Sequence, residues 1–535
     1  MRDTGSVKIV TSANKSSLPA LPREGGIQGI AGDPNSAELS ALVVRGVGWK
    51  IFSQTTVQIT RIVVGIMLAR LLTPSEFGLA AMALVLSGFI VPFADVGLGA
   101  ALVQRKEITD DDCSTVFWAS IGAGVLLTGG LILAAPAIGS FYGNSQVTPL
   151  VAVLSTGFII TALGSTHRSL LVRSMNFRSL EVRYVIGSVA SGAVAVALAL
   201  AKYGAWAFVA QELVLAGVST VLLWFVLPWR PRFRFGWANL RDLGGFGIRV
   251  LGGAFFRNLN GNTDNLLIGK YIGAAALGLY AFAYNLMLLP VSRIVAPLQQ
   301  VVFPAFSRVQ DDRARLASMW LRANRLIAAV CAPLLLGAMI TAPALIPLVF
   351  GGHWRPAVPV VRILCWVGIL QCVSAINDSV LQAGNGMKAY IRFMACSFAV
   401  NVSAFVIGLH WGIIGVAAAF AVSSTLLLVV YTVLVTRSIG IAAPTFVRAF
   451  AGLTQALVGA TAVALLVWIA VTGMGVIPLI QVIATTGAGL AAYAGLLGWR
   501  EPQLAREVRG LIASRRTSPT LRTSRQGGAD AVIST

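Results

Sequence analysis

Four polar side chains recur along the first long apolar stretch of the sequence. They are Lys50, Gln54, Gln58 and Arg61, at intervals of four, four and three residues. In a helix these intervals place all four on one face over about 16 Å. Two cations and two amides in a row could line a water-filled passage, and we expect such a cavity-lining stripe. Snorkelling of Lys50 and interhelical hydrogen bonds of the glutamines are the structural alternatives.

A second polar run interrupts the seventh apolar stretch, where it cannot face lipid because hydrocarbon offers no hydrogen-bond partner. It contains Arg257, Asn258, Asn262 and Asp264. We expect a hydrophilic cavity or a cation site here. A plain ion-pair network is the alternative, because Arg257 and Asp264 are seven residues apart and share a helix face. In the eighth stretch, Arg293 falls near the middle and could contact a ligand or bond a helix-end carbonyl.

One further carboxylate, Asp95, lies inside the second apolar stretch beside a proline and two glycines that would loosen or kink a helix. It could bind a proton or a sodium ion, or it could pair with a cation of the first stretch. Asp95 and Asp264 are therefore the candidates for cation binding or gating. The three histidines fall near loop ends, so the sequence indicates no metal site, and no cofactor is expected.

The elements that carry these residues are apolar stretches, each long enough to cross a bilayer. Of 535 residues, 56% are hydrophobic and only 11% charged, which is typical of an all-α integral membrane protein. The predicted transmembrane helices number fourteen, and their approximate bounds are 43–70, 78–103, 114–135, 147–167, 184–202, 205–227, 246–270, 278–303, 319–341, 357–383, 391–409, 413–435, 446–471 and 475–497.

The loops between these stretches indicate the orientation, since lysine and arginine favour the cytoplasmic side. Fifteen basic residues fall on one set of alternate loops and four on the other. The four predicted outer residues are Arg70, Lys202, Lys270 and Arg355. We therefore expect a multi-pass membrane protein with two cytoplasmic ends. Residues 1–42 and the basic segment 499–535 are predicted to be disordered tails.

The chain also resembles itself after a shift of 200 residues. Residues 68–84 fall without gaps on residues 268–284, and Gly78 falls on Gly278. Chance similarity between membrane helices is the alternative. A repeat of six spans predicts two lobes of the same orientation, 43–228 and 245–435, joined by a basic linker at 229–244. The helices of 446–498 lie outside this repeat.

Several function classes are disfavoured. The formal net charge of +21 lies in loops and a tail beside apolar spans, where anionic lipid explains it better than nucleic acid. The sequence contains no phosphate loop, no HExxH site and no long soluble loop for catalysis, so we do not expect an enzyme. Energy would come from a Na⁺ or H⁺ gradient or from the membrane potential.

Several ordered segments between about residues 40 and 440 resemble one family of membrane transporters. These are DVGLGAALVQRKEIT and STVFWAS at 95–120, MNFRSLEVR at 175–183, DNLLIGKYIGAAALGLY at 264–280, LPVSRIVAPLQQVVFPAFSRVQDD at 289–312 and VFGGHWRPAVPVV at 349–361. They are similar to the polysaccharide transporter branch of the multidrug/oligosaccharidyl-lipid/polysaccharide (MOP) flippase superfamily. That family has no strict catalytic motif to transfer onto this sequence.

The resemblance implies two six-helix lobes around a central cavity with a lateral portal, here with two extra helices at the C-terminal end. It also implies export of undecaprenyl-pyrophosphate-linked oligosaccharide units for exopolysaccharide, capsule or O-antigen. The units would pass from the cytoplasmic to the periplasmic leaflet of the bacterial inner membrane by alternating access of the two lobes. A polysaccharide polymerase and a chain-length regulator would be the protein partners in such a pathway. The alternatives are a multidrug or cation antiporter of the same superfamily and a polymerase or ligase of lipid-linked sugars.

Overall fold

The structure, a computed structural model, describes residues 36–94, 99, 102–103, 105, 108–236, 261–309, 312–383 and 387–514, and no β-strand occurs among them. The helices of the first half are α1 (Ser36–Leu71), α2 (Pro74–Ala94), α4 (Asp110–Tyr142), α5 (Val147–Ser155), α6 (Gly157–Arg173), α7 (Phe177–Leu200) and α8 (Trp206–Val226). A helical segment at 261–271 opens the second half. It is followed by α10 (Ala274–Arg308), α11 (Arg313–Phe350), the 3₁₀-helix η2 (Gly352–Ala357), α12 (Val358–Val373), α13 (Asn377–Ala383), α14 (Met387–Gly408), η3 (Leu409–Trp411), α15 (Gly412–Ile439), α16 (Ala443–Gly473), α17 (Pro478–Arg500) and α18 (Pro502–Ser514).

The predicted class of fold is confirmed, because the described chain is a multi-pass, all-helical membrane protein. Ten of its helical stretches are long and apolar enough to cross a bilayer. One of these, Met387–Ile439, contains both α14 and α15. The count of fourteen spans and the division into lobes at 43–228 and 245–435 stay predictions.

The helices extend further into the flanking charged sequence than hydropathy indicates. The basic segment 168–183 was expected to be a loop on the cytoplasmic side, and the expectation of a loop is wrong for all but its three central residues. Helix α6 continues to Arg173 and α7 begins at Phe177, so only residues 174–176 connect them. The side chain of Asn176 accepts a hydrogen bond from the backbone N–H of Ser179 (3.2 Å) and thereby caps α7. Arginine tolerates these positions because its aliphatic stem can lie along a helix end while its charge reaches water.

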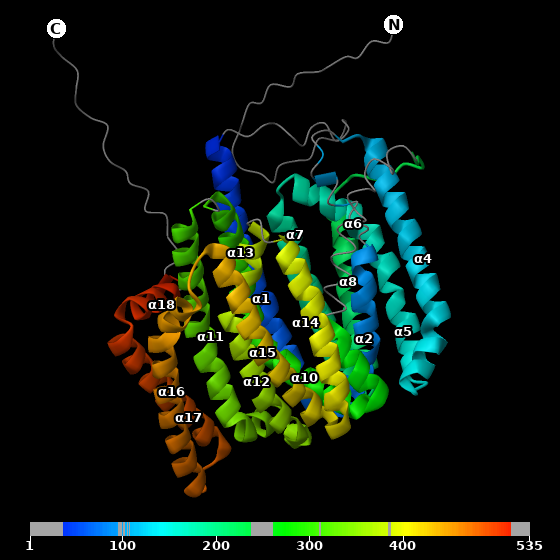
Figure 1. Cartoon of the computed structure of the whole chain (residues 1–535). Helices are drawn as coiled ribbons and strands as arrows, with labels where there is room; N and C mark the ends of the chain where they lie inside the picture. Colours follow the sequence, from blue (N-terminus) through cyan, green and yellow to red (C-terminus); the bar gives the residue numbers. More distant parts are fainter. Residues whose placement is uncertain are drawn as a thin grey trace, which may run out of the picture.

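In the first half, α7 packs along both α1 and α8, α4 packs on α6, and α2 packs on α5. In the second half, α12 contacts α10, α11 and α15, and α14 pairs with α15. Figure 1 shows α4 and α5 at one edge of the helical bundle and α16 and α17 at the opposite edge. The halves meet most extensively where α2 packs along α10.

The contact between α2 and α10 depends on two glycines. A methyl group on Gly78 would lie 1.7 Å from the carbonyl oxygen of Ala274, and one on Gly278 would lie 1.8 Å from the carbonyl oxygen of Pro74. No side chain larger than hydrogen fits at either position. Each glycine lies four residues into its helix and faces the first residue of the other helix. This reciprocal contact is what an axis of two-fold pseudosymmetry between repeats would produce.

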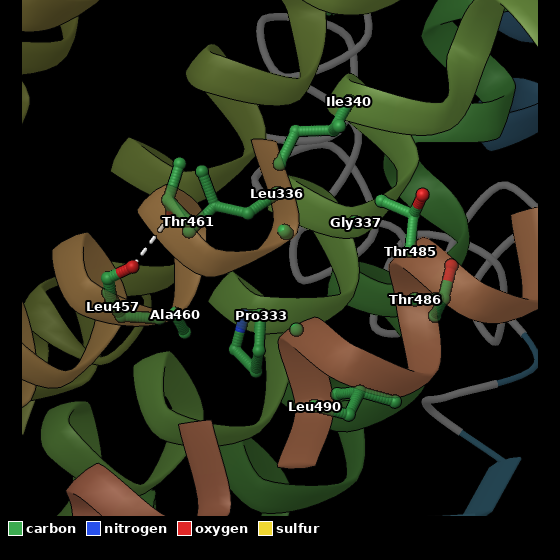
Figure 2. A pocket seen from close by; sticks show the side chains of 12 residues that line it. Pro333, Leu336, Gly337, Ile340, Leu457, Ala460, Thr461, Thr485, Thr486 and Leu490 are labelled. Carbon is green, nitrogen blue, oxygen red and sulfur yellow. Dashed lines mark hydrogen bonds between the residues drawn. The ribbon is translucent and has the colours of Figure 1, made fainter. Parts of the chain in front are cut away.

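The last three helices form a unit at the edge of the bundle. Helices α16 and α17 pack against each other and against α11. Figure 2 shows Pro333 and Leu336 of α11 facing Ala460 of α16 and Leu490 of α17 around a pocket of about 30 Å³. That volume holds one or two water molecules and is far too small for a sugar chain.

Part of the predicted disordered tail is helical. Helix α18 begins at Pro502 and buries Leu504 and Ala505, and it packs on α11 and α17. Two ion pairs join this region to α11, Arg325 with Glu501 at 2.8 Å and Arg322 with Glu507 at 3.0 Å. The apolar face of α18 and the pairing of these two glutamates with arginines of α11 explain why this part of the tail is ordered.

Candidate functional site

A large cavity opens among the helices of the first half. Its volume is about 860 Å³, and side chains of α1, α5, α6, α7 and α8 line it. Most of its lining residues lie in the half of these helices nearer to the turn between α6 and α7. The polar and charged side chains of the lining are Ser53, Gln54, Arg61, Thr161, Ser165, Arg168, Glu181, Arg183, Tyr184, Glu212, Ser219 and Thr220.

Helix α1 contributes part of the predicted stripe to this cavity. Gln54 and Arg61 line it, seven residues apart on one face of the helix. The Arg61 guanidinium donates a hydrogen bond from Nη2 to the Tyr184 hydroxyl oxygen at 2.6 Å and lies 5.9 Å from the centre of the same ring. Gln58 is half-buried, and its buried Oε1 accepts no hydrogen bond within the protein.

Two further arginines reach the cavity from other helices. Arg168 lies near the end of α6 and Arg183 in the second turn of α7. The Nε of Arg183 is buried and donates to no protein acceptor. Arginine is a fork of donors suited to phosphate oxygens, so three guanidinium groups around one cavity can bind an anion with several oxygens.

Two carboxylates share this cavity with the arginines. Glu212 of α8 interacts electrostatically with Arg61, and Glu181 of α7 interacts with Arg183. The three arginines outnumber the two glutamates, so the net charge of the cavity lining is positive. Each glutamate can partly neutralise one arginine when no ligand is bound.

The rim of the cavity near the α6–α7 turn is fixed by hydrogen bonds. Arg173, the last residue of α6, donates from Nη1 to the carbonyl oxygen of Leu102 at 2.9 Å and to that of Arg105. Met175 adopts a left-handed backbone conformation with a φ of 53°, which lets the chain reverse within three residues. The two cavity arginines on α6 and α7 therefore sit on a tight helical hairpin.

Sequence reasoning missed Arg168, Arg183, Tyr184, Glu181 and Glu212. The first four lie in or beside the expected loop at 168–183. Its basic residues were attributed to the preference of arginine and lysine for cytoplasmic loops, and no site was assigned to them. Glu212 had a clear signal, because a carboxylate within an apolar stretch is costly and indicates a function. Extending the helices to their charged ends would have placed the others on helix faces.

The remaining predicted site residues are placed unevenly. Asp95, Arg257 and Asn258 lie outside the described residues. Lys50 belongs to α1 and Arg293 to α10, and only the backbone is described at these two positions. A common chamber for the four predicted cations thus stays a prediction.

Asp264 and Asn262 lie in the helical segment 261–271, away from the cavity lining. Asp264 is 4% exposed and accepts hydrogen bonds from the Tyr280 hydroxyl at 3.0 Å and from the backbone N–H of Asn265 at 2.8 Å. Asn262 is half-buried. Among the residues that the structure describes, no three His, Cys, Asp or Glu side chains are grouped so that they could hold a metal ion.

Comparison with known proteins assigns the chain to a family. The family model described as "Polysaccharide biosynthesis protein" matches residues 67–359. The teichuronic acid biosynthesis protein TuaB of Bacillus subtilis is 31% identical over 344 residues, which are 64% of this chain and 71% of that protein. The chain belongs to the polysaccharide biosynthesis protein family. The predicted family membership is therefore confirmed.

Two other relatives of this polysaccharide biosynthesis protein come from Escherichia coli and Rhizobium meliloti. The lipopolysaccharide biosynthesis protein WzxC of Escherichia coli is 27% identical and covers 70% of this chain and 77% of its own length. The succinoglycan biosynthesis transport protein ExoT of Rhizobium meliloti is 29% identical, and the match covers 68% of this chain and 74% of ExoT.

Solved structures show the same fold. The lipid II flippase MurJ in an inward closed conformation matches 88% of this chain and all of its own with a TM-score of 0.67 at 13% identity. A multidrug resistance MATE family transporter of the MOP superfamily, in an inward-facing conformation, matches 72% of this chain and 94% of its own with a TM-score of 0.58 at 15% identity. The MOP-type helical fold expected from the sequence is confirmed.

Proposed function

We propose that this protein is a flippase that moves polyprenyl-diphosphate-linked oligosaccharide units from the cytoplasmic to the outer leaflet of the bacterial inner membrane. It is a transporter and performs no catalysis. The observation that carries this proposal is the cavity lined by Arg61, Arg168 and Arg183. The names of WzxC and ExoT, which belong to lipopolysaccharide and succinoglycan biosynthesis, support a lipid-linked glycan as the cargo.

The chemistry of such a cargo suits this cavity. A diphosphate presents several anionic oxygens, and three guanidinium groups can meet them with bidentate hydrogen bonds. Glutamine, serine and threonine side chains of the lining can bind sugar hydroxyls. The polyprenyl chain would stay in the surrounding lipid. Lys50, Arg257 and Arg293 would extend the cationic route beyond the described cavity.

The transport cycle would use two lobes, 43–228 and 245–435, that rock about their shared interface. The cavity would load from the cytoplasmic side, where both ends of the chain lie. An anionic headgroup that moves outward travels down the electrical gradient of an inside-negative potential, which yields about 2.3 kcal/mol per charge for every 100 mV. The potential or a Na⁺ or H⁺ gradient can therefore drive the cycle. A polymerase and a chain-length regulator would receive the product.

The test is transport by purified protein in liposomes, with a short-chain polyprenyl-diphosphate oligosaccharide as substrate. Arg61→Ala, Arg168→Ala and Arg183→Ala should each lower the initial rate by about 10- to 100-fold, because a hydrogen bond to a charged group contributes about 1.5–3 kcal/mol. Arg448→Ala, an exposed position on α16, is the matched control. Normal transport by all three cavity variants would refute the proposal.

A multidrug antiporter is the competing function within the superfamily. Such a protein would need a cavity in which carboxylates outnumber cations, and here the arginines outnumber the glutamates. Uptake of a cationic dye in the same liposomes, with no transport of the diphosphate substrate, would favour the competitor.

A further inference from the structure

The end of α1 is hydrogen-bonded to the end of α11 and to the following η2, across the two halves of the molecule. Arg70, in the last turn of α1, donates from Nε to the carbonyl oxygen of Val349 and from Nη2 to that of Leu348, both at 2.7 Å. These carbonyls belong to the last turn of α11, which has no further turn to bond them. The guanidinium thus caps a helix end that also attracts positive charge through its dipole.

The end of α1 is also bonded to η2, which follows α11, and here α1 supplies the acceptor. The carbonyl oxygen of Ala69 at the end of α1 accepts from Trp354 Nε1 at 2.7 Å and lies 2.9 Å from His353 Nε2. Trp354 is fully buried and stacks on Phe282 of α10, with ring centres 4.2 Å apart. It also meets the ring of Phe77 of α2 edge-on at 4.9 Å. One indole therefore touches α1, α2 and α10.

A second contact resembles that of Arg70, but here the basic residue comes from the second half of the chain and the helix end from the first half. The Lys270 ammonium, at the end of segment 261–271, lies 4.7 Å from the centre of the Phe141 ring in the last turn of α4. The adjacent Gly269 packs so closely on Tyr142 that a methyl group there would lie 2.7 Å from its ring. Lys270 is the residue that the 200-residue shift places on Arg70. In each half, a basic residue at the end of one helix thus reaches a helix end of the other half.

We propose that these contacts form an outer clasp, defined by Arg70, Trp354 and Lys270 with their partners, that closes the cavity toward the outer face and opens to release cargo. This inference rests on the proposed transport cycle. Arg61 lies ten residues before the end of α1, so the clasp is about 15 Å from the cavity arginines along the helix. Beside the clasp, Gly78 and Gly278 bring the backbones of α2 and α10 into direct contact.

The clasp is built from interactions that water can replace. Arg70, His353 and Lys270 are exposed, and helix-end carbonyls accept hydrogen bonds from water as readily as from a side chain. Separating the helix ends therefore leaves no exposed cation or carbonyl without a partner. The buried Trp354 differs, because its withdrawal would uncover an aromatic surface and so gives the closed state its main apolar contact.

The test measures access to the cavity from outside, which needs no knowledge of the cargo. Gln54→Cys is introduced with all five native cysteines replaced by alanine, and a membrane-impermeant thiol reagent is added to the outside of intact cells. In this background Arg70→Ala and Lys270→Ala together should raise the labelling rate at least fivefold, and Arg70→Lys should raise it less. Arg355→Ala, an exposed cation on η2 beside the clasp, should leave the rate unchanged.

Two results would overturn the inference. One is an unchanged labelling rate in the double variant, and the other is an equal increase with Arg355→Ala. Thermal melting of each purified variant identifies a general loss of structure, which would raise labelling of Gln54→Cys from both sides alike and would also count against a clasp. Labelling that follows the prediction while the diphosphate substrate is not transported would leave the clasp standing and refute the proposed cargo.

Discussion

Arg61 and Tyr184, which stand 123 residues apart in the chain, meet in the cavity through a hydrogen bond of 2.6 Å. Arginine carries only donors, so the phenol oxygen must be the acceptor. The Tyr184 hydroxyl proton is then directed elsewhere and can be donated to a ligand oxygen. The pair therefore presents donors from α1 and α7 to the same volume.

Tyr184→Phe should weaken binding of the anionic headgroup by about 3- to 10-fold, because it removes one acceptor for Arg61 and one donor for the ligand. The aromatic ring beside the guanidinium is kept, so melting temperature should hardly change. Binding of a polyprenyl-diphosphate analogue by calorimetry measures the effect. Tyr203→Phe, at an exposed position in the turn between α7 and α8, serves as the control. Equal affinities for both variants would show that the hydroxyl has no part in binding.

Glu212→Gln should have the opposite effect on affinity. The carboxylate interacts electrostatically with Arg61, so an incoming phosphate would have to compete with it for that positive charge. Its neutralisation should tighten binding of the diphosphate analogue on the order of 10-fold and slow turnover, because release becomes harder. The measurements are affinity and initial transport rate on the same preparation. Weaker binding in Glu212→Gln would mean that the carboxylate positions Arg61 and does not compete with the ligand.

Gly78→Ala should destabilise the contact between the halves. The added methyl would overlap the backbone of Ala274, which cannot rotate away as a side chain could, so a loss of about 1–3 kcal/mol in the free energy of unfolding is expected. Gly217→Ala is the matched control in α8, since its methyl would meet no atom within 4 Å and alanine favours a helix by about 0.5–1 kcal/mol. The melting temperature in detergent should fall for the first variant and hold or rise for the second. A melting temperature unchanged by Gly78→Ala would contradict the tight packing of α2 on α10.

The fold class followed from hydropathy alone, because a bilayer demands long apolar helices and little else satisfies a buried backbone. The ends of the helices could not be predicted in the same way. A hydropathy profile ends a predicted span at the first charged residue, whereas a helix continues until a capping residue ends it. This is why 168–183 was mistaken for a loop, although Asn176 marks the start of α7. The same error hid α18, whose order depends on partners in α11 that are nearly two hundred residues away.

The candidate site was half predictable. The spacing of Gln54 and Arg61 identified one face of α1, and the structure places both on the cavity; whether they touch cargo stays a prediction. The cavity residues on α6, α7 and α8 meet those of α1 only because of the way these helices pack. The sequence of one helix does not show which other helices it packs against. The alignment of Gly78 with Gly278, by contrast, was readable in the sequence, and its physical basis is a backbone contact that excludes any side chain.

The three-residue turn between α6 and α7 has a mechanical consequence. So short a connection keeps the first turns of α7 beside the end of α6, so Arg168 and Arg183 cannot move far apart even if the two helices tilt. Arg61 has no such covalent tie to them, because α1 is held to α7 by packing and by the hydrogen bond to Tyr184. Releasing a bound diphosphate would therefore require that α7 shift along α1, while the spacing of Arg168 and Arg183 changes little.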